Sequence, residues 1–337
     1  MTLRIGINGF GRIGRLVARA VFEGYAGDDV EIVAINDPGG NFFPLLKYDS
    51  IHGRAPFTVE RDLEHDHIMI DGKVIHRFRS RDPKELKWGD EGVDILLECT
   101  GRFKDREGAQ LHMDRGAKKV LISAPGEDED ITVVYGVNHD LVQKEHKIVS
   151  NASCTTNCLA PVAYALHKEI GIEKGFMTTI HAYTGDQNLV DGSHKDPLRA
   201  RAAAMSIIPS STGAAKAVGK VLPELDGKLD GVALRVPTAN VSLVDLTFLP
   251  SKATSVEAVN AAVTKYAHGE MKGVLDVYDD PCVSIDFNHD PHSSIFSLAG
   301  TKIVDGDFVR VMSWYDNEWG FSCRMIDTAL KMHKVGY

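Results

Sequence analysis

The 337-residue sequence has few cysteines, no excess of basic residues and no long apolar run. Its five cysteines are an odd number and lack the spacing of a disulfide framework, which favours a reducing, intracellular setting. With 38 basic and 47 acidic residues the formal net charge is −9. A dedicated nucleic-acid-binding protein needs a clustered basic face for phosphates, so this balance argues against that class.

A membrane helix requires an apolar run of roughly 20 residues, and none is present, so we expect no membrane association. The segment Leu3–Asn8 already has a strand pattern, so we expect no signal peptide before it and predict a cytoplasmic protein. The composition, 43% hydrophobic and 25% charged, is that of a folded globular chain. At roughly 150 residues per domain, the length suggests two domains.

The first half of the chain alternates short apolar runs with amphipathic stretches. Runs of Val, Ile and Leu without polar alternation suit parallel strands that are buried on both faces and joined by helices. Apolar residues also alternate around Asp71-Gly72, which indicates an antiparallel hairpin over 67–76. The expected strands are 3–8, 31–36, 94–99, 119–123, 132–137 and 148–149, and the expected helices 13–22 and 105–115.

The second half is richer in strand patterns and poorer in helices. Ser255–His268 predicts a capped helix and Phe321–Lys334 an amphipathic one. Grouped strands with helices to one side indicate an antiparallel α+β domain. The expected strand segments are 175–184, 232–249, 282–288 and 295–314, whereas 185–210 contains no clear element and predicts a long functional loop.

The fold class predicted is therefore α/β plus α+β, with a Rossmann doubly wound sheet followed by an antiparallel-sheet catalytic domain. We place the first domain, which contains the doubly wound sheet, at residues 1–151 and the second domain at 152–316. We expect the C-terminal helix, within 317–337, to pack back on the first domain.

A G-x-G-x-x-G motif lies between strand 3–8 and helix 13–22. Gly9, Gly11 and Gly14 allow a tight turn and close approach of a pyrophosphate to the helix N-terminus. The following strand ends at Asp37, whose carboxylate can accept both adenosine ribose hydroxyls and would repel a 2′-phosphate. The acidic residue at this position therefore favours NAD over NADP. The alternative is a glycine turn that only packs a helix on a sheet.

Cys154 lies where a strand pattern changes to a helix pattern, in Ser150–Cys158. A helix N-terminus is expected to pull the pKa of this thiol below the roughly 8.5 of a free cysteine. His181, within a later strand pattern, would serve as its base if the two side chains meet. The alternatives are a zinc site formed with Cys158, for which no second ligand cluster follows, or packing roles for Cys158 and His181. We predict no metal.

Anion-binding candidates occur in the second half. The string 211–216 looks like a helix start whose hydroxyl and backbone donors could hold a phosphate, although a plain helix cap is the common reading. Arg235 lies in an apolar strand, where an arginine is costly unless it is paired or faces a site. Arg199, in the long loop, is the weaker candidate, and Asn317 could be only a helix cap.

Taken together, these sequence segments closely resemble those of the phosphorylating, glycolytic glyceraldehyde-3-phosphate dehydrogenases, and the resemblance covers essentially the whole chain. It rests on the segments 8–15, 150–157, 181–184, 207–220, 235–238 and 314–320. It implies a cytoplasmic homotetramer that oxidises glyceraldehyde 3-phosphate with NAD and inorganic phosphate through a Cys154 thiohemiacetal and thioester. The long loop, about residues 182–206, would pack near the neighbouring subunit's cofactor.

The resemblance also implies a role for each matching residue. Cys154 matches the nucleophile, His181 the base, and Asn317 the residue that holds the nicotinamide carboxamide. Thr184 and Arg235 match one phosphate site, and Arg199 matches a residue that contributes to binding the substrate phosphate. The other phosphate site matches Ser153, Thr155, Thr212 and Gly213. The dinucleotide contacts, besides the three glycines, match Arg12, Ile13, Asp37, Arg81, Thr100 and Ser123.

Three departures from the family pattern bear on function. Phe321 replaces the usual tyrosine beside the nicotinamide, and Pro197-Leu198 replaces Leu-Arg, which puts an ion pair near Arg199 in doubt. Gly192-Ser193 replaces a Leu-Pro pair common in NAD-strict members, so dual use of NADP stays open. The alternative functions are erythrose-4-phosphate dehydrogenase, which shares the cysteine and histidine, and a catalytically silent NAD-binding regulatory protein. Neither the working direction in metabolism nor oxidative regulation at Cys154 follows from the sequence.

Overall fold

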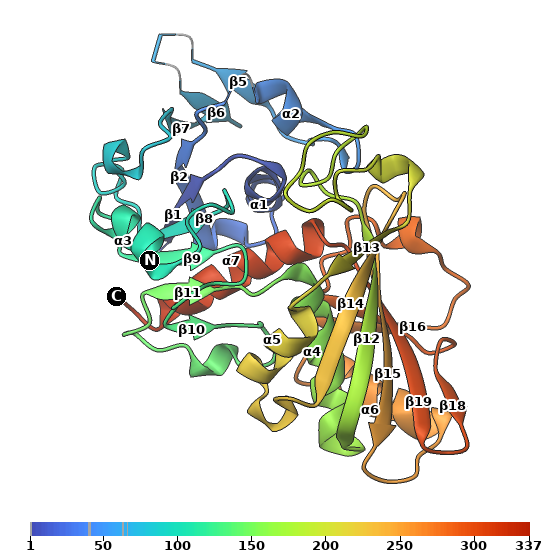
Figure 1. Ribbon diagram of the computed structural model, residues 1–337. Helices are drawn as coiled ribbons and strands as arrows, with labels where there is room; N and C mark the ends of the chain where they lie inside the picture. The colour runs from blue at the N-terminus through green and yellow to red at the C-terminus, as the bar shows by residue number, and fades with distance from the viewer. Residues whose placement is uncertain (1, 40–41, 63, 66) are drawn as a thin grey trace. The chain divides into compact units, whose positions relative to one another are not determined.

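The computed structural model describes residues 2–39, 42–62, 64–65 and 67–337 (Figure 1). Contacts divide this chain into two compact units. The first comprises Met1–Tyr135, His139–Ser153 and Phe321–Tyr337, and the second comprises Gly136–Asn138 and Cys154–Gly320.

The first unit is built on a mostly parallel sheet. Its described strands follow the order β10-β11-β9-β8-β1-β2-β7-β6-β5, and the pairs from β10 to β7 are parallel. The strands are β1 Leu3–Asn8, β2 Val30–Asn36, β5 Val59–Arg61, β6 Ile68–Ile70, β7 Lys73–Phe78, β8 Ile95–Glu98, β9 Lys119–Ile122, β10 Ile131–Thr132 and β11 Ile148–Ser150. A separate ribbon pairs β3 Tyr48–Asp49 with β4 Gly53–Arg54. This is the doubly wound sheet that the apolar runs predict.

The hairpin at Asp71-Gly72 is confirmed. β6 and β7 pair antiparallel around it, and both turn residues have positive φ, +46° and +78°. β5 then adds an antiparallel edge to the parallel sheet. The helices of this unit are α1 Arg12–Phe22, α2 Phe43–Lys47, α3 Arg106–Met113 and most of α7 Trp319–Lys334.

The segment of α7 within the first unit is held there by buried polar contacts. Thr328 donates to the side chain of Asn151 at 2.8 Å, and the Tyr25 hydroxyl donates to Asp327 at 3.0 Å. An apolar core beside the sheet includes the fully buried Trp88, Leu96 and Val120.

The second unit contains a mixed, mainly antiparallel sheet in the order β13-β14-β12-β15-β19-β17-β16, with β18 paired to β19. β12 and β14 are parallel, as are β16 and β17. The strands are β12 Ile172–Ala182, β13 Ile208–Ser211, β14 Leu229–Val236, β15 Ser242–Pro250, β16 Leu275–Tyr278, β17 Ser294–Ser297, β18 Lys302–Val304 and β19 Phe308–Tyr315.

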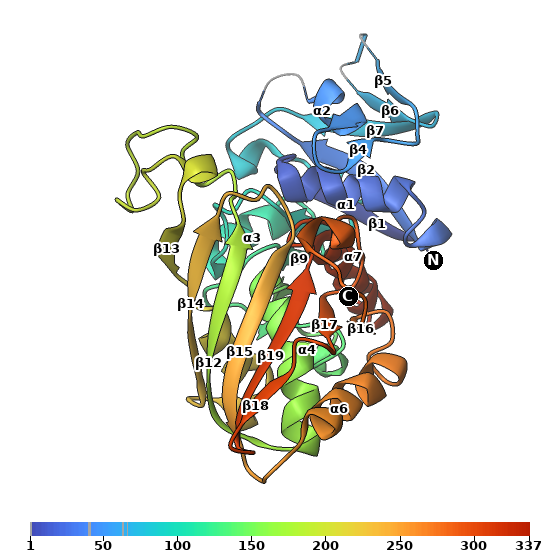
Figure 2. The same cartoon turned by 90° about the vertical axis from the view of Figure 1, so that its right-hand side faces the viewer.

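Three helices, α4 Cys154–Glu169, α5 Ala214–Val221 and α6 Val256–His268, cover one face of this sheet (Figures 1 and 2). Burial alternates along β15, where Val244, Leu246 and Phe248 are buried and the residues between them are half-exposed. Such alternation is typical of a sheet with one covered face. The predicted cap of α6 is confirmed, because the Ser255 side chain accepts from the Ala258 N–H at 3.2 Å.

Three local predictions were wrong. The segment 282–288 is not a strand but contains a 3₁₀ turn, Ser284–Phe287, because the Asp286 carboxylate accepts from the Val283 N–H at 2.7 Å. The strand expected at 132–137 is reduced to β10, Ile131–Thr132. The loop 185–210 contains a 3₁₀ turn at Ala203–Met205 and the beginning of β13.

Within the described ranges, no helix combines the length and the apolar character that crossing a membrane requires.

Candidate active site

A strained turn leads the chain into α4. Ala152 is fully buried and has φ +56°, in the left-handed region that residues other than glycine rarely adopt. The Ser150 hydroxyl holds this turn by accepting from the Ala152 N–H at 3.1 Å. Backbone strain of this kind is often found at functional sites. The first residue of α4 after the turn is Cys154, as the sequence predicts.

Within the second unit, the structure brings the predicted nucleophile and base together. His181 lies on β12 and is 5% exposed. Its Nε2 atom is 3.6 Å from the Sγ atom of Cys154, although 27 residues separate them in the sequence. The geometry is that of a thiol hydrogen-bonded to an imidazole, the arrangement that activates a cysteine nucleophile.

The other ring nitrogen of His181 determines its tautomer. Nδ1 lies 2.7 Å from the carbonyl oxygen of Ala182. A carbonyl oxygen can only accept, so Nδ1 carries the proton and Nε2 presents a lone pair to Cys154. Arg235 also donates to the Ala182 carbonyl, at 2.9 Å, and its approach to Nδ1 at 3.1 Å is therefore a close contact between two donors.

The charge state of the pair differs from the prediction. Burial raises the pKa of the Cys154 thiol, and Arg235 and the hydrogen bonds at the start of α4 only partly oppose this. The predicted lowering by the helix N-terminus is thus outweighed by desolvation. Burial and the nearby Arg235 lower the pKa of His181 to about 3. Near neutral pH the pair consists of a thiol and a neutral imidazole that is ready to accept a proton.

Arg235 and Thr184 lie together beside His181. Arg235, on β14, pairs with His181 in the parallel β12–β14 register, and its Nη1 lies 3.4 Å from the Thr184 hydroxyl. Burial lowers the pKa of Arg235, because a buried cation loses hydration. Among the described residues no carboxylate forms a salt bridge with this guanidinium, so it remains available to an anion.

Arg199, which is predicted to contribute to substrate phosphate binding, is paired. It forms ion pairs with Asp186 at 2.5 Å and with Asp196 at 3.5 Å, all within the long loop. Pro197 and Leu198 therefore leave local ion pairing of Arg199 intact. Its positive charge is close enough to contribute to the lowered pKa of His181.

In the second predicted anion set, Thr155 and Thr212 form hydrogen bonds with residues outside the set. Thr155 follows Cys154 on α4, and its hydroxyl is 2.9 Å from the Tyr315 hydroxyl. The Thr212 hydroxyl accepts from the Ala214 N–H at 3.2 Å, and Gly213 precedes α5 without a side-chain cap. Ser153 directly precedes α4. Among the described residues, the start of α5 forms no hydrogen bond with Cys154.

Asn317 is held by a partner that sequence reasoning missed. Its Oδ1 atom accepts from the buried Ser242 hydroxyl at 2.8 Å. Asp316, rather than Asn317, caps α7, because its carboxylate accepts from the N–H groups of Glu318 and Trp319 at 2.9 and 2.8 Å. The helix-cap reading of Asn317 was therefore wrong.

In the first unit, the glycine motif has the geometry of a phosphate cradle. Gly9 has φ +91°, and a Cβ there would lie 2.7 Å from Thr100. A Cβ at Gly14 would lie 2.2 Å from the Gly9 carbonyl oxygen, whereas the space in front of Gly11 is open. Gly11 is the N-cap of α1, and no side chain caps that helix. The open approach and the uncapped helix start fit a pyrophosphate.

A cavity of about 270 Å³ lies at the carboxyl ends of β1, β2 and β8 in the same unit. Arg81 and Thr100, for which the family resemblance implies dinucleotide contacts, line it together with Asn8 and Asn36. Asp37 follows β2, next to the lining residue Pro38, and its carboxylate accepts from the Gly39 N–H at 2.9 Å. The cavity is the size and polarity expected for part of a nucleotide.

The remaining predicted dinucleotide residues lie near these strand ends. Arg12 and Ile13 begin α1, and Arg12 forms an ion pair with Asp49 at 2.6 Å. That pair and nearby backbone N–H groups lower the pKa of Asp49 to about 2, despite its burial. Ser123 follows β9 and donates its N–H to the Glu98 carbonyl oxygen at 3.0 Å.

Glu98 is a buried residue of this site that the sequence did not reveal. Its carboxylate accepts from Asn8 at 2.5 Å, from the Thr100 N–H at 2.7 Å and from the Thr100 hydroxyl. Asn36 in turn donates to Asn8 at 2.7 Å. The sequence contained one indication of this role. Glu98 is a charged residue inside the apolar strand 94–99, and a buried carboxylate needs hydrogen-bonding or ionic partners.

The zinc alternative fits the geometry poorly. Cys158 is fully buried, and its Sγ lies 3.5 Å from the Ser294 hydroxyl and 3.7 Å from the Ser313 carbonyl. No cluster of metal ligands is found among the described residues.

Two domain families match the chain. Residues 3–106 match the NAD binding domain of glyceraldehyde 3-phosphate dehydrogenase, and residues 153–317 match its C-terminal domain. The glyceraldehyde-3-phosphate dehydrogenase of Xanthobacter flavus is 57% identical over 338 residues, covering 100% of both chains. Those of Cereibacter sphaeroides (56%, covering 99% of this chain and 100% of the relative) and Geobacillus stearothermophilus (53%, 100% of both) are similarly close. The chain belongs to the glyceraldehyde-3-phosphate dehydrogenase family.

Proposed function

We propose that this chain carries out the reaction of its family through Cys154 and His181. The activity is the NAD-dependent, phosphorylating oxidation of D-glyceraldehyde 3-phosphate to 1,3-bisphosphoglycerate, a step of glycolysis and, in reverse, of gluconeogenesis. The observation that carries the residue assignment is the 3.6 Å contact between Cys154 Sγ and the lone pair of His181 Nε2.

The first step follows from the charge state of the pair. The sulfur attacks the aldehyde carbon, the C=O π electrons move to oxygen, and the thiol proton passes to His181 Nε2. The developing oxyanion is stabilised by this N–H and by the Cys154 backbone N–H at the start of α4. His181 returns the proton to this oxygen, and the product is a neutral thiohemiacetal on Cys154.

Oxidation and release complete the cycle. NAD, when bound, would supply the hydride acceptor. His181 takes the hydroxyl proton as the thiohemiacetal carbon gives up its hydride and the thioester forms. Inorganic phosphate then attacks the thioester carbonyl, and the Cys154 thiolate leaves and regains its proton from His181. This chemistry needs two anion sites, to which we assign Thr184, Arg235 and Arg199 on one hand, and Ser153, Thr155, Thr212 and Gly213 on the other.

The chain's own residues fit NAD. We assign the phosphates to Gly9, Gly11, Gly14, Arg12 and Ile13, the ribose to Asp37, the adenosine half to Arg81, Thr100 and Ser123, and the nicotinamide carboxamide to Asn317. The cradle at α1 and the cavity beside Arg81 and Thr100 support the first and third of these assignments. We also retain 1–151, 152–316 and 317–337 as the proposed domain division, and a cytoplasmic location, which the odd cysteine number favours.

The substrate assignment is tested by comparing sugars and phosphate. We expect kcat/KM to be at least about tenfold higher for glyceraldehyde 3-phosphate than for erythrose 4-phosphate, and steady NADH formation to require inorganic phosphate. Initial rates at matched concentrations measure both. Preference for erythrose 4-phosphate, with no need for phosphate, would assign the chain to the other branch, and absence of NADH with either sugar would indicate a silent binding protein.

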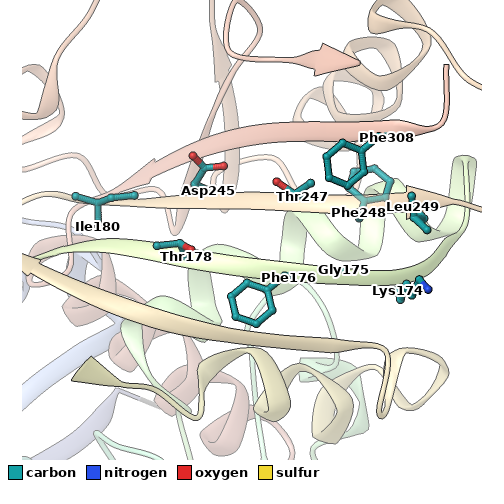
Figure 3. Close-up of a pocket in the computed structure, with 10 residues that line it drawn as sticks. All are labelled: Lys174, Gly175, Phe176, Thr178, Ile180, Asp245, Thr247, Phe248, Leu249 and Phe308. Atoms are coloured by element: carbon teal, nitrogen blue, oxygen red, sulfur yellow. The ribbon is translucent and has the colours of Figure 1, made fainter. Parts of the chain in front are cut away.

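We further propose a homotetramer, as the family resemblance implies. The uncovered face of the second sheet is hollowed by a cavity of about 660 Å³, lined by Phe176, Thr178 and Ile180 of β12 and by Asp245 and Thr247 of β15 (Figure 3). In the long loop, Leu189 and Met205 are 80% and 84% exposed. Apolar surface of this kind is typical of an interface. Light scattering should give four times the chain mass, and a monomer mass would contradict the proposal.

A further inference from the structure

Ser242, which no predicted role includes, bridges two parts of the second unit. It is the first residue of β15 and is 1% exposed. Its hydroxyl oxygen accepts from the backbone N–H of Ala182 at 3.0 Å. The same hydroxyl donates to Oδ1 of Asn317 at 2.8 Å.

These two contacts fix which way the Asn317 amide faces. A serine hydroxyl has one proton, and the Ala182 N–H can only donate to it, so the proton is directed to Asn317. Asn317 must present its oxygen, because a reversed amide would leave the buried serine proton without an acceptor. Among the described residues the Nδ2 group of Asn317 has no partner, and it remains available as a donor.

The carbonyl of the same residue, Ala182, orients the base. The Ala182 carbonyl accepts from Nδ1 of His181 at 2.7 Å and from Arg235 at 2.9 Å. The N–H of Ala182 contacts Ser242. The two peptide groups on either side of the Ala182 Cα therefore lie between His181 and Asn317: the N–H of one contacts Ser242 and the carbonyl of the next accepts from His181.

The backbone before Ser242 is strained. Val241 has φ +65° and is 3% exposed, and a β-branched residue in this region is an outlier that the surroundings must hold. One contact that stabilises this conformation is the hydrogen bond that Asn240 donates to the Asp316 carboxylate at 2.8 Å. The segments 240–242 and 316–317 are thus joined by two side-chain hydrogen bonds.

We propose that Ser242 is a positioning residue that orients the Asn317 amide so that Nδ2 donates to the carboxamide carbonyl of NAD. This inference rests on the proposed role of Asn317. Ser242 itself does not contact the dinucleotide in this account; it determines which end of Asn317 is offered to it.

The test compares NAD with ADP-ribose, which lacks the nicotinamide ring. Ser242→Ala should weaken NAD binding about three- to tenfold, the range of one lost hydrogen bond, and leave the affinity for ADP-ribose unchanged. Ser242→Thr, which keeps the hydroxyl, should restore NAD affinity. Calorimetric titration measures both ligands, and an unchanged affinity for ADP-ribose together with an unchanged circular-dichroism spectrum shows that the variant is folded.

A double-mutant cycle separates the inference from its premise. Asn317→Ala should weaken NAD binding, and adding Ser242→Ala to it should cause no further loss, because the serine acts through the asparagine. If Asn317→Ala weakens NAD but Ser242→Ala does not, or if Ser242→Ala weakens both ligands equally, the role of Ser242 is wrong. If Asn317→Ala leaves NAD affinity unchanged, the proposed role of Asn317 fails first.

Discussion

Replacing Cys154 by serine should lower kcat for NAD reduction by at least about 10⁴-fold, with glyceraldehyde 3-phosphate and phosphate as substrates. A serine hydroxyl is a far weaker nucleophile than a thiol next to a base, and removing a covalent nucleophile typically costs losses of this order. Steady-state NADH formation measures the effect.

The matched control is Cys282→Ser, at a cysteine that is half-buried, lies in a loop and has no role in the proposed site. It should leave kcat and KM unchanged. NAD binding by the Cys154→Ser protein should also stay normal, which shows that the loss is chemical. Near-normal NADH formation by this variant would rule out the covalent route.

Replacing His181 by asparagine should lower kcat about 10²–10⁴-fold, the usual value of general base assistance. It should also slow alkylation of Cys154 at pH 7. Burial raises the pKa of this thiol, so little thiolate is present near neutral pH. Without the Nε2 lone pair no base accepts the thiol proton as the sulfur attacks, and only the small preformed thiolate fraction reacts.

The pH profile gives the sign of this effect. Because the pKa of His181 is lowered to about 3, its imidazole stays neutral from pH 5 to 9, and alkylation should rise with pH as the thiol ionises. In His181→Asn the same rise should be displaced to higher pH. His268→Asn, at the end of α6, serves as the control. Identical alkylation profiles for the wild type and His181→Asn would remove His181 from the role of base.

The sequence was most informative where local chemistry and local structure coincide. Gly9 to Gly14 follow a strand and open a helix, so their function could be predicted from order alone. The parallel sheet followed from apolar runs, and the hairpin from Asp71-Gly72. Cys154 was predictable as a helix-start cysteine because the strand and helix patterns meet there.

What the sequence could not show depends on contacts between distant segments. Ser242 and Asn317 are 75 positions apart, and no periodicity indicates that they share a proton. Nothing in the sequence predicts the positive φ of Ala152, because alanine adopts that conformation only when its surroundings impose it. The direction of the Cys154 pKa shift was missed for a related reason: the helix N-terminus is visible in the sequence, whereas the burial that outweighs it is not.

The central claim, a covalent acyl intermediate on Cys154, is tested most directly by omitting inorganic phosphate. The enzyme is mixed with NAD and glyceraldehyde 3-phosphate, and the reaction is quenched in acid. After digestion, the mass of the peptide containing Cys154 is measured by mass spectrometry. We predict a burst of about one NADH per site and a 3-phosphoglyceroyl thioester on Cys154 that disappears when phosphate is added. A burst that leaves Cys154 unmodified, or an adduct on another residue, would contradict the account.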